Sequence, residues 1–160
     1  MEIAIVNGTD HFVIGGTNEA LARLEGVAPD LGIPRIKRLP VSLASHTSML
    51  SQAGEELTAA LEKSTLRSPP VPVLAGISGE VIRQRERGIL VLGRQVAQTV
   101  QWETCLRMAV ELGCRVFLEI GPGNALAQML RESYPELKAR AVEEFRTLQG
   151  VIDWMHKNLD

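Results

Sequence analysis

The side chain in this sequence best suited to acid–base chemistry is the imidazole of His46, in the stretch P-V-S-L-A-S-H-T-S-M-L over residues 40–50. An imidazole titrates near neutral pH, so it can take a proton from a nucleophile and later return it. Two interpretations are open for His46. It is either a catalytic base or a half-exposed structural histidine near the start of a helix.

The residues around His46 predict a strand that leads into a helix. Val41 and Leu43 alternate with small residues, which is typical of a strand with one packed face. Beyond His46 the apolar residues recur at helical spacing, and Ser45 or Thr47 could cap that helix by accepting its first N–H groups. A histidine at such a junction lies at the carboxyl edge of a sheet, where open α/β folds place their chemistry.

A second landmark is the turn Gly121-Pro122-Gly123 after a nearly continuous apolar run over residues 115–120. The run predicts a buried strand of a parallel sheet, and the helix after the turn could hold an anion at its N-terminus. The spacing lacks the G-x-G-x-x-G pattern of nucleotide sites, and no Walker lysine follows. The turn therefore carries no nucleotide fingerprint.

The first forty residues predict a small α+β piece. Two β-prone runs, 2–6 and 11–15, flank Asn7-Gly8, a pair that favours positive φ angles and a tight hairpin turn. A helix capped by Thr17 and a strand over residues 33–42 should follow. This order resembles the latter part of a ferredoxin-like unit, so we expect an incomplete ferredoxin-like subdomain over 1–40 and a larger α/β piece over 41–160.

The remaining segments alternate between strands and helices, which defines the α/β class. We expect an extended segment over residues 71–75 and a charged, solvated loop over 83–87. Two helices should follow, over 89–96 and 100–113. An edge strand over 139–142 and a terminal helix from Leu148 onward complete the chain.

Composition and charge exclude several classes of function. With 45% hydrophobic and 22% charged residues, the 160-residue chain should fold as a globular protein with one core. A formal net charge of −2 argues against nucleic acid and anionic membranes as partners. No run approaches the roughly 20 apolar residues of a membrane span, and no leader peptide is visible, so we expect a cytoplasmic location.

The two cysteines, Cys105 and Cys114, do not indicate a metal site. Their spacing fits no metal-ligand pattern, and no histidine pair accompanies them. Cys105 falls on an apolar helical stripe, so we expect it to pack in the core as a reduced thiol. No metal and no covalently bound cofactor are expected.

Four ordered segments resemble motifs of the malonyl-CoA:acyl-carrier-protein transacylase family. The stretch around His46 is similar to V-S-x-P-S-H-C-A-L-M. Residues 94–102, R-Q-V-A-Q-T-V-Q-W, are similar to R-Q-L-x-x-P-V-x-W, with Thr99 in place of proline. Residues 117–126 resemble E-[VI]-G-P-G-x-x-L, and residues 7–15 resemble N-S-P-G-Q-V-V-I-[AS]-G, with His11 in place of glutamine. Together they resemble only the C-terminal half of the family's domain.

This resemblance implies a fold and a set of roles. The fold would be the C-terminal part of an α/β-hydrolase-like parallel-sheet domain. His46 would be the catalytic base, the main-chain carbonyl of Gln95 would orient its ring, and Asn7 and Ser45 would lie near the acyl pocket. Glu119 and the glycines of the turn after it would have a structural role. The reaction would move a malonyl group from coenzyme A to the phosphopantetheine thiol of an acyl carrier protein, through an acyl-serine intermediate.

The nucleophile is not where the resemblance requires it. The family's serine lies in G-H-S-x-G-E, upstream of the histidine, and this sequence has no such motif. Ser78, in G-I-S-G-E, lacks the preceding histidine and follows His46. The resemblance therefore implies that the missing N-terminal half of the domain is a partner and that this chain alone is inactive.

Two alternatives stay open beside the enzyme. The chain could be a non-catalytic fragment or interaction module, or an acyltransferase domain cut from a polyketide or fatty-acid synthase. Residues 143–154 further resemble the end of the transacylase (epsilon) subunit of bacterial malonate decarboxylase.

Overall fold

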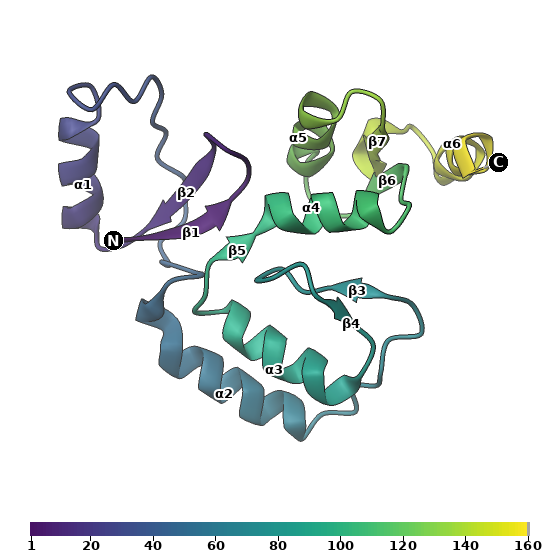
Figure 1. Cartoon of the computed structure of the whole chain (residues 1–160), viewed down its shortest axis with the longest axis horizontal. Helices are drawn as coiled ribbons and strands as arrows, with labels where there is room; N and C mark the ends of the chain where they lie inside the picture. Colours follow the sequence, from purple (N-terminus) through teal and green to yellow (C-terminus); the bar gives the residue numbers. More distant parts are fainter. Residues whose placement is uncertain (160) are drawn as a thin grey trace. The chain divides into compact units, whose positions relative to one another are not determined.

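The computed structural model describes residues 1–159, and within them it has six α-helices, two short 3-10 helices and seven strands (Figure 1). The predicted mixed α/β class is therefore confirmed. The chain forms two compact units, Met1–Cys105 and Leu106–Asp160. The seam predicted at Pro40 lies inside the first unit and stays a prediction.

The first unit begins with the hairpin that the sequence predicts. Strand β1 (Glu2–Val6) pairs antiparallel with β2 (Phe12–Gly15), and β1 also pairs in parallel with β5 (Val100–Gln101). Neither residue of the Asn7-Gly8 pair has the expected positive φ. A two-residue turn would need that geometry, whereas the longer loop here closes with Asn7 N donating to His11 O at 2.9 Å.

Helix α1 (Asn18–Val27) begins as predicted, because Ala20 N donates to the Thr17 hydroxyl at 3.2 Å. The strand predicted over residues 33–42 is wrong, since this segment is irregular. Pro34 and Pro40 each remove a main-chain donor that a strand would use. In addition, β2 and β5 already occupy the two edges of β1.

Helices α2 (Ser51–Glu62) and α3 (Arg85–Gln95) pack closely against each other in the first unit. Two glycines permit this approach. A Cβ at Gly54 would lie 2.7 Å from the carbonyl oxygen of Gly93, and a Cβ at Gly93 would overlap the Thr58 hydroxyl. This packing fixes the C-terminal end of α3, the end that carries Gln95.

The loop predicted over residues 83–87 is wrong from Arg85 onward, where α3 begins. The Arg85 guanidinium donates to the carbonyl oxygens of Glu62 and Leu66, both at 2.8 Å. An arginine that satisfies carbonyls at and just past a helix end stabilises that end. Arg85 therefore links the end of α2 to the start of α3, while the other residues of the charge run are exposed.

A small hairpin completes the first unit. Strand β3 (Val73–Leu74), part of the predicted extended segment, pairs antiparallel with β4 (Val81–Ile82). The buried side chains of Ala75, Ile82 and Val91 form a cluster beneath the hairpin.

Helix α4 (Trp102–Glu111) leads into the second unit, where β6 (Val116–Glu119) and β7 (Lys138–Ala141) pair in parallel. The sequence predicted both strands, although β6 is half-buried rather than fully buried. Helix α5 (Ala125–Ser133) connects them. A short 3-10 helix, η2 (Val142–Glu144), and the terminal helix α6 (Leu148–Leu159) follow. No helix within residues 1–159 is long and apolar enough to span a bilayer.

Candidate functional site

His46 is attached to the C-terminal end of α3 through both its main chain and its ring. Its N–H donates to the Val96 carbonyl at 2.8 Å, and its Nδ1 lies 2.5 Å from the Gln95 carbonyl oxygen. The last carbonyls of a helix lack partners within the helix, so they are available to hold an imidazole. The histidine is half-buried, neither enclosed in the core nor free in solvent.

The tautomer of His46 follows from its partner. A carbonyl oxygen can only accept, so the 2.5 Å contact requires that Nδ1 carry the hydrogen. In the neutral ring Nε2 then has a free lone pair, which is the state a general base needs. The geometry is thus suited to proton transfer at Nε2.

The local structure around His46 differs from the prediction. Residues 41–43 form no strand, and Val41 and Leu43 are exposed. A 3-10 turn, η1 (Ser48–Leu50), separates His46 from α2, and neither Ser45 nor Thr47 caps a helix through its side chain. Thr47 Oγ1 donates instead to the Ala44 carbonyl at 2.7 Å.

The carboxylate of Glu2, in β1, accepts hydrogen bonds from Ser48, the first residue of η1. Both the N–H of Ser48, at 2.9 Å, and its hydroxyl donate to the Glu2 carboxylate. These hydrogen bonds hold the pKa of Glu2 below its ordinary value. The hairpin thereby helps to fix the turn that follows His46, a contact that the sequence pattern did not indicate.

The other predicted site residues are not joined to the imidazole. Asn7 follows β1 and is half-buried, with its main-chain N–H bonded to His11. Ser45 is half-buried in the loop beside His46. Among residues 1–159 no hydrogen bond connects either side chain to the His46 ring, and their proximity to an acyl pocket stays a prediction.

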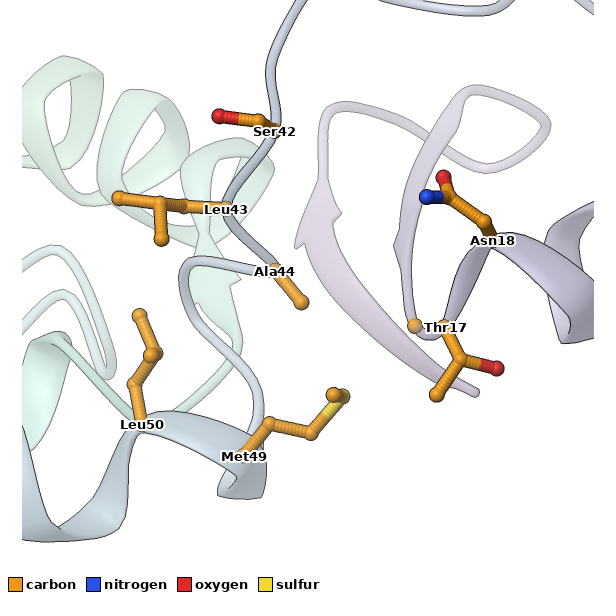
Figure 2. Close-up of a pocket in the computed structure, with 8 residues that line it drawn as sticks. Thr17, Asn18, Ser42, Leu43, Ala44, Met49 and Leu50 are labelled. Atoms are coloured by element: carbon orange, nitrogen blue, oxygen red, sulfur yellow. The ribbon is translucent and has the colours of Figure 1, made fainter.

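A pocket of about 250 Å³ lies beside the loop that carries His46. Figure 2 shows Leu43 and Leu50 on one side of it, and Thr17 and Asn18 of the α1 start on the other. His46 and Gln95 do not line it. The sequence pattern did not predict this pocket, because its walls come from two segments that are far apart in the chain.

Ser78 has a structural role in the turn between β3 and β4. Its N–H donates to the Ala75 carbonyl at 3.2 Å, and its hydroxyl accepts from Glu80 N at 3.3 Å. Within residues 1–159 no hydrogen bond connects Ser78 with His46. The expectation that Ser78 is not the nucleophile stays a prediction.

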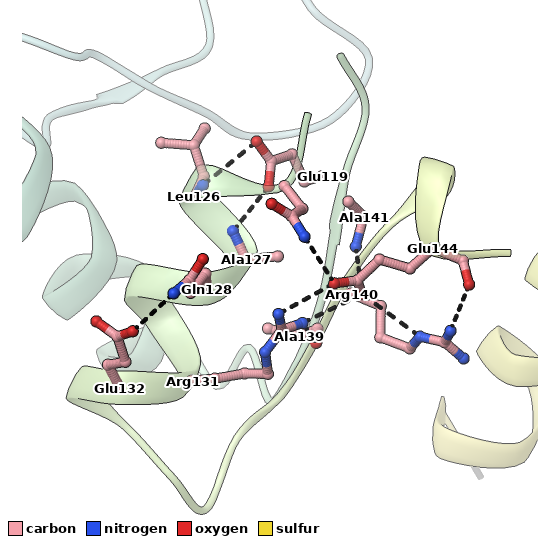
Figure 3. A network of polar contacts seen from close by, with 11 residues as sticks. Glu119, Leu126, Ala127, Gln128, Arg131, Glu132, Ala139, Arg140, Ala141 and Glu144 are labelled. Carbon is pink, nitrogen blue, oxygen red and sulfur yellow. Dashed lines mark hydrogen bonds and ion pairs between the residues drawn. The ribbon is translucent and has the colours of Figure 1, made fainter. Parts of the chain in front are cut away.

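The helix N-terminus after Gly123 is occupied by carboxylates of the chain itself. Glu119 accepts from Ala127 N at 2.7 Å and from Leu126 N at 3.3 Å (Figure 3), and Glu143 accepts from Gly123 N at 2.9 Å. These acceptors satisfy the N–H groups that an anion would use. The structural interpretation of Glu119 is therefore confirmed.

Glu144 connects η2 with α5 and β7 through an ionic network (Figure 3). Its carboxylate pairs with Arg131 at 3.0 Å and with Arg140 at 3.6 Å, and it also accepts from Ala141 N at 3.2 Å. The hydrogen bond from Arg131 is the main reason that the pKa of Glu144 lies below its ordinary value.

The two cysteines are free thiols that differ in burial. Cys105 is buried as predicted, and burial raises the pKa of its thiol, which lies 3.3 Å from the Ala75 carbonyl oxygen. Cys114 is exposed. In the part of the chain that the structure describes, no group of three or more His, Cys, Asp or Glu side chains could hold a metal ion.

No family model matches the chain. Among curated proteins, the chain is 26% identical over 160 residues to the malonyl CoA-acyl carrier protein transacylase of Bacillus subtilis, covering 100% of this chain and 50% of that protein. It is 30% identical over 153 residues to the transacylase of the same name from Escherichia coli K12, covering 92% of this chain and 48% of that one. The chain thus spans about half the length of the curated relatives it matches.

Solved structures give the same result. The acyl-carrier-protein-S-malonyltransferase of Bartonella henselae matches 98% of this chain and 49% of its own length, with a TM-score of 0.86 and 28% identity. PlMCAT:AntF, a type II polyketide synthase acyl-carrier protein in complex with its malonyl-transacylase, matches 98% of this chain and 50% of its own, with a TM-score of 0.87 and 27% identity. The fold matches the C-terminal part of the transacylase fold. Sequence and structure together support the malonyl-CoA:acyl carrier protein transacylase family for this chain.

Proposed function

We propose that this chain supplies the histidine-bearing part of a malonyl-CoA:acyl carrier protein transacylase site, with His46 as the general base. The observation that carries the proposal is the 2.5 Å contact between His46 Nδ1 and the Gln95 carbonyl oxygen. This contact leaves Nε2 free to accept a proton. The Gln95 carbonyl thus has the orienting role that an aspartate has in serine proteases.

The proposed reaction has two acyl transfers. A serine hydroxyl gives its proton to Nε2 of His46 while its oxygen attacks the thioester carbon of malonyl-CoA. The C–S bond then breaks, and the proton passes from His46 to the departing thiolate of coenzyme A. The thiol of a carrier phosphopantetheine reverses these steps and takes the malonyl group. Main-chain N–H groups would stabilise the oxyanion.

The nucleophile of this proposal lies outside the 160 residues, on a segment that carries G-H-S-x-G-E. The partners are that segment, an acyl carrier protein and a coenzyme A thioester, and no cofactor beyond the two substrates takes part. A cytoplasmic location and a ferredoxin-like small subdomain belong to the same proposal. The likeness of residues 143–154 to the malonate decarboxylase epsilon subunit makes that complex one setting, and a fatty-acid or polyketide synthase is another.

One observation favours a second candidate, a non-catalytic interaction module. The 160 residues contain no serine in a nucleophile motif, and Ser78 is used in a turn. A module of this kind would have the transacylase fold and would bind an acyl carrier protein without acylating itself.

The test is reconstitution with radiolabelled malonyl-CoA. The chain alone should take up no label. With a separately produced polypeptide that carries the G-H-S-x-G-E half of a transacylase, label should reach a holo acyl carrier protein. H46A should then lower the transfer rate about 100- to 10,000-fold. S78A is the matched control and should transfer at the unaltered rate.

Two results would contradict the proposal. Stable labelling of the chain alone at Ser78 would place the nucleophile within the 160 residues. Equal transfer rates for H46A and the unaltered chain, in a reconstituted mixture that is active, would remove His46 from the reaction.

A further inference from the structure

The main chain at His46 is in an unusual conformation. Its φ is +63°, in the left-handed region that costs a residue with a Cβ roughly 1–2 kcal/mol. Such a conformation persists only when neighbouring groups impose it. The hydrogen bonds to Gln95 and Val96 hold the residue from one side, and the next residue, Thr47, holds it from the other.

The hydroxyl and the methyl group of Thr47 each make a contact that holds the turn. It is only 1% exposed, and its hydroxyl donates to the Ala44 carbonyl at 2.7 Å, which closes the turn that contains His46. Its methyl group lies against β2. A Cβ built on Gly15 would be 2.7 Å from Thr47 Cγ2, closer than real Cβ atoms come. Because Gly15 has no side chain, the methyl group of Thr47 can pack against β2 at this position.

We propose that Gly15 and Thr47 are positioning residues, and that the contact between them sets the His46 imidazole on the Gln95 carbonyl. As a statement about catalysis this rests on the proposed function, because the ring must act as a base. As a statement about geometry it stands on the contacts of the chain alone.

The two halves of the Thr47 side chain are separable by substitution. T47V keeps the methyl group that faces Gly15 and replaces the hydroxyl that bonds to Ala44 with a second methyl group. T47S keeps the hydroxyl and removes the methyl group that faces Gly15. G15A adds the Cβ that would meet that methyl group, so T47S should relieve the effect of G15A. The double variant G15A/T47S therefore tests the contact itself.

The direct readout is the tautomer of His46 in long-range ¹H–¹⁵N spectra of the full chain. The unaltered chain should show a protonated Nδ1 and an unprotonated Nε2 in its neutral ring. G15A and T47V should lose this signature and show averaged tautomers, while G15A/T47S should regain it. G8A is the matched control, because a Cβ at Gly8 has nothing within 4 Å.

The second readout is transfer in the reconstituted mixture. G15A should lower kcat about tenfold or more and leave KM for malonyl-CoA within about twofold, because the ring is displaced and not removed. G15A/T47S should recover most of the rate. If G15A fails to fold, the test rests on T47V and T47S, which add no heavy atom to the core.

Two results would overturn the inference. One is a folded G15A with the tautomer signature of the unaltered chain. The other is a folded G15A/T47S that stays as altered as G15A. Failure of the proposed function is distinguishable: the tautomers would respond as described, while H46A would leave transfer unchanged.

Discussion

At the scale of single residues, His46 has a strained backbone and a well-bonded side chain. The φ of +63° is unfavourable for any residue with a Cβ, whereas the bonds to Gln95 and Val96 offset that cost. An imidazole held in this way cannot rotate freely away from the Gln95 carbonyl. The strain and the bonds make separate contributions to stability, so substitutions should separate them.

We predict that H46G is more stable than H46A by about 1 kcal/mol, because glycine adopts positive φ at no steric cost. Both variants lose the imidazole and its bond to Gln95, so the difference reports the backbone alone. Urea unfolding followed by circular dichroism measures it. If H46A is as stable as H46G, the left-handed conformation at residue 46 is not present in solution.

The site could be predicted from the sequence only through the family resemblance. His46 and Gln95 are 49 positions apart, and no local pattern relates a histidine to a distant main-chain carbonyl. The hydrogen bond between them is present, while the catalytic role stays a prediction. The capping prediction for Thr47 is wrong because capping rules consider only the following helix, whereas the Thr47 hydroxyl donates back to Ala44.

At the scale of elements, the packing of α2 against α3 positions the acceptor of the His46 ring. Gly54 and Gly93 bring the two helix backbones close together, and Gln95 ends α3 just beyond Gly93. The Thr58 hydroxyl bonds to the Gly54 carbonyl at 2.9 Å and occupies the space facing Gly93. A change in this contact should therefore move the carbonyl that orients the imidazole.

We predict that G93A destabilises the chain by about 1–3 kcal/mol, because its Cβ would overlap Thr58. The matched control is G26A in α1, where a Cβ meets nothing within 4 Å. There alanine should stabilise the helix by about 0.5–1 kcal/mol. Thermal unfolding of both variants measures the two effects. A G93A variant as stable as G26A would show that α2 and α3 are not in close contact.

The elements that were predicted correctly are those set by local rules. The first hairpin and the Thr17-capped helix depend on neighbours within a few residues. The strand predicted over 33–42 is irregular because Pro34 and Pro40 each remove a main-chain donor, and β5, from residues 100–101, is the strand that pairs with β1 instead. The sequence pattern does not predict the start of α3, because only the fold brings the end of α2 to the Arg85 side chain.

At the scale of the whole molecule, glutamates with lowered pKa values occur in both units. Ser48 lowers the pKa of Glu2, and Arg87 lowers that of Glu80, both in the first unit. Arg131 lowers the pKa of Glu144 in the second unit. A carboxyl whose pKa is lower in the folded state binds fewer protons there than in the unfolded chain. Its stabilisation is therefore full above the unfolded pKa and is lost as the pH falls through the folded pKa.

We predict that the free energy of unfolding is steady near neutral pH and falls from about pH 5 downward. E144Q should cost about 1 kcal/mol at pH 7, a modest value because the ion pairs with Arg131 and Arg140 are partly exposed to solvent. At about pH 3 its deficit should be smaller, since Glu144 itself is then becoming protonated. Urea unfolding of the unaltered chain and of E144Q across this pH range measures both effects.

The matched control is E136Q, at an exposed glutamate with no hydrogen bond or ion pair within residues 1–159. It should follow the unaltered chain throughout. A deficit of E144Q that is equal at pH 7 and pH 3 would mean that its effect comes from packing and not from charge.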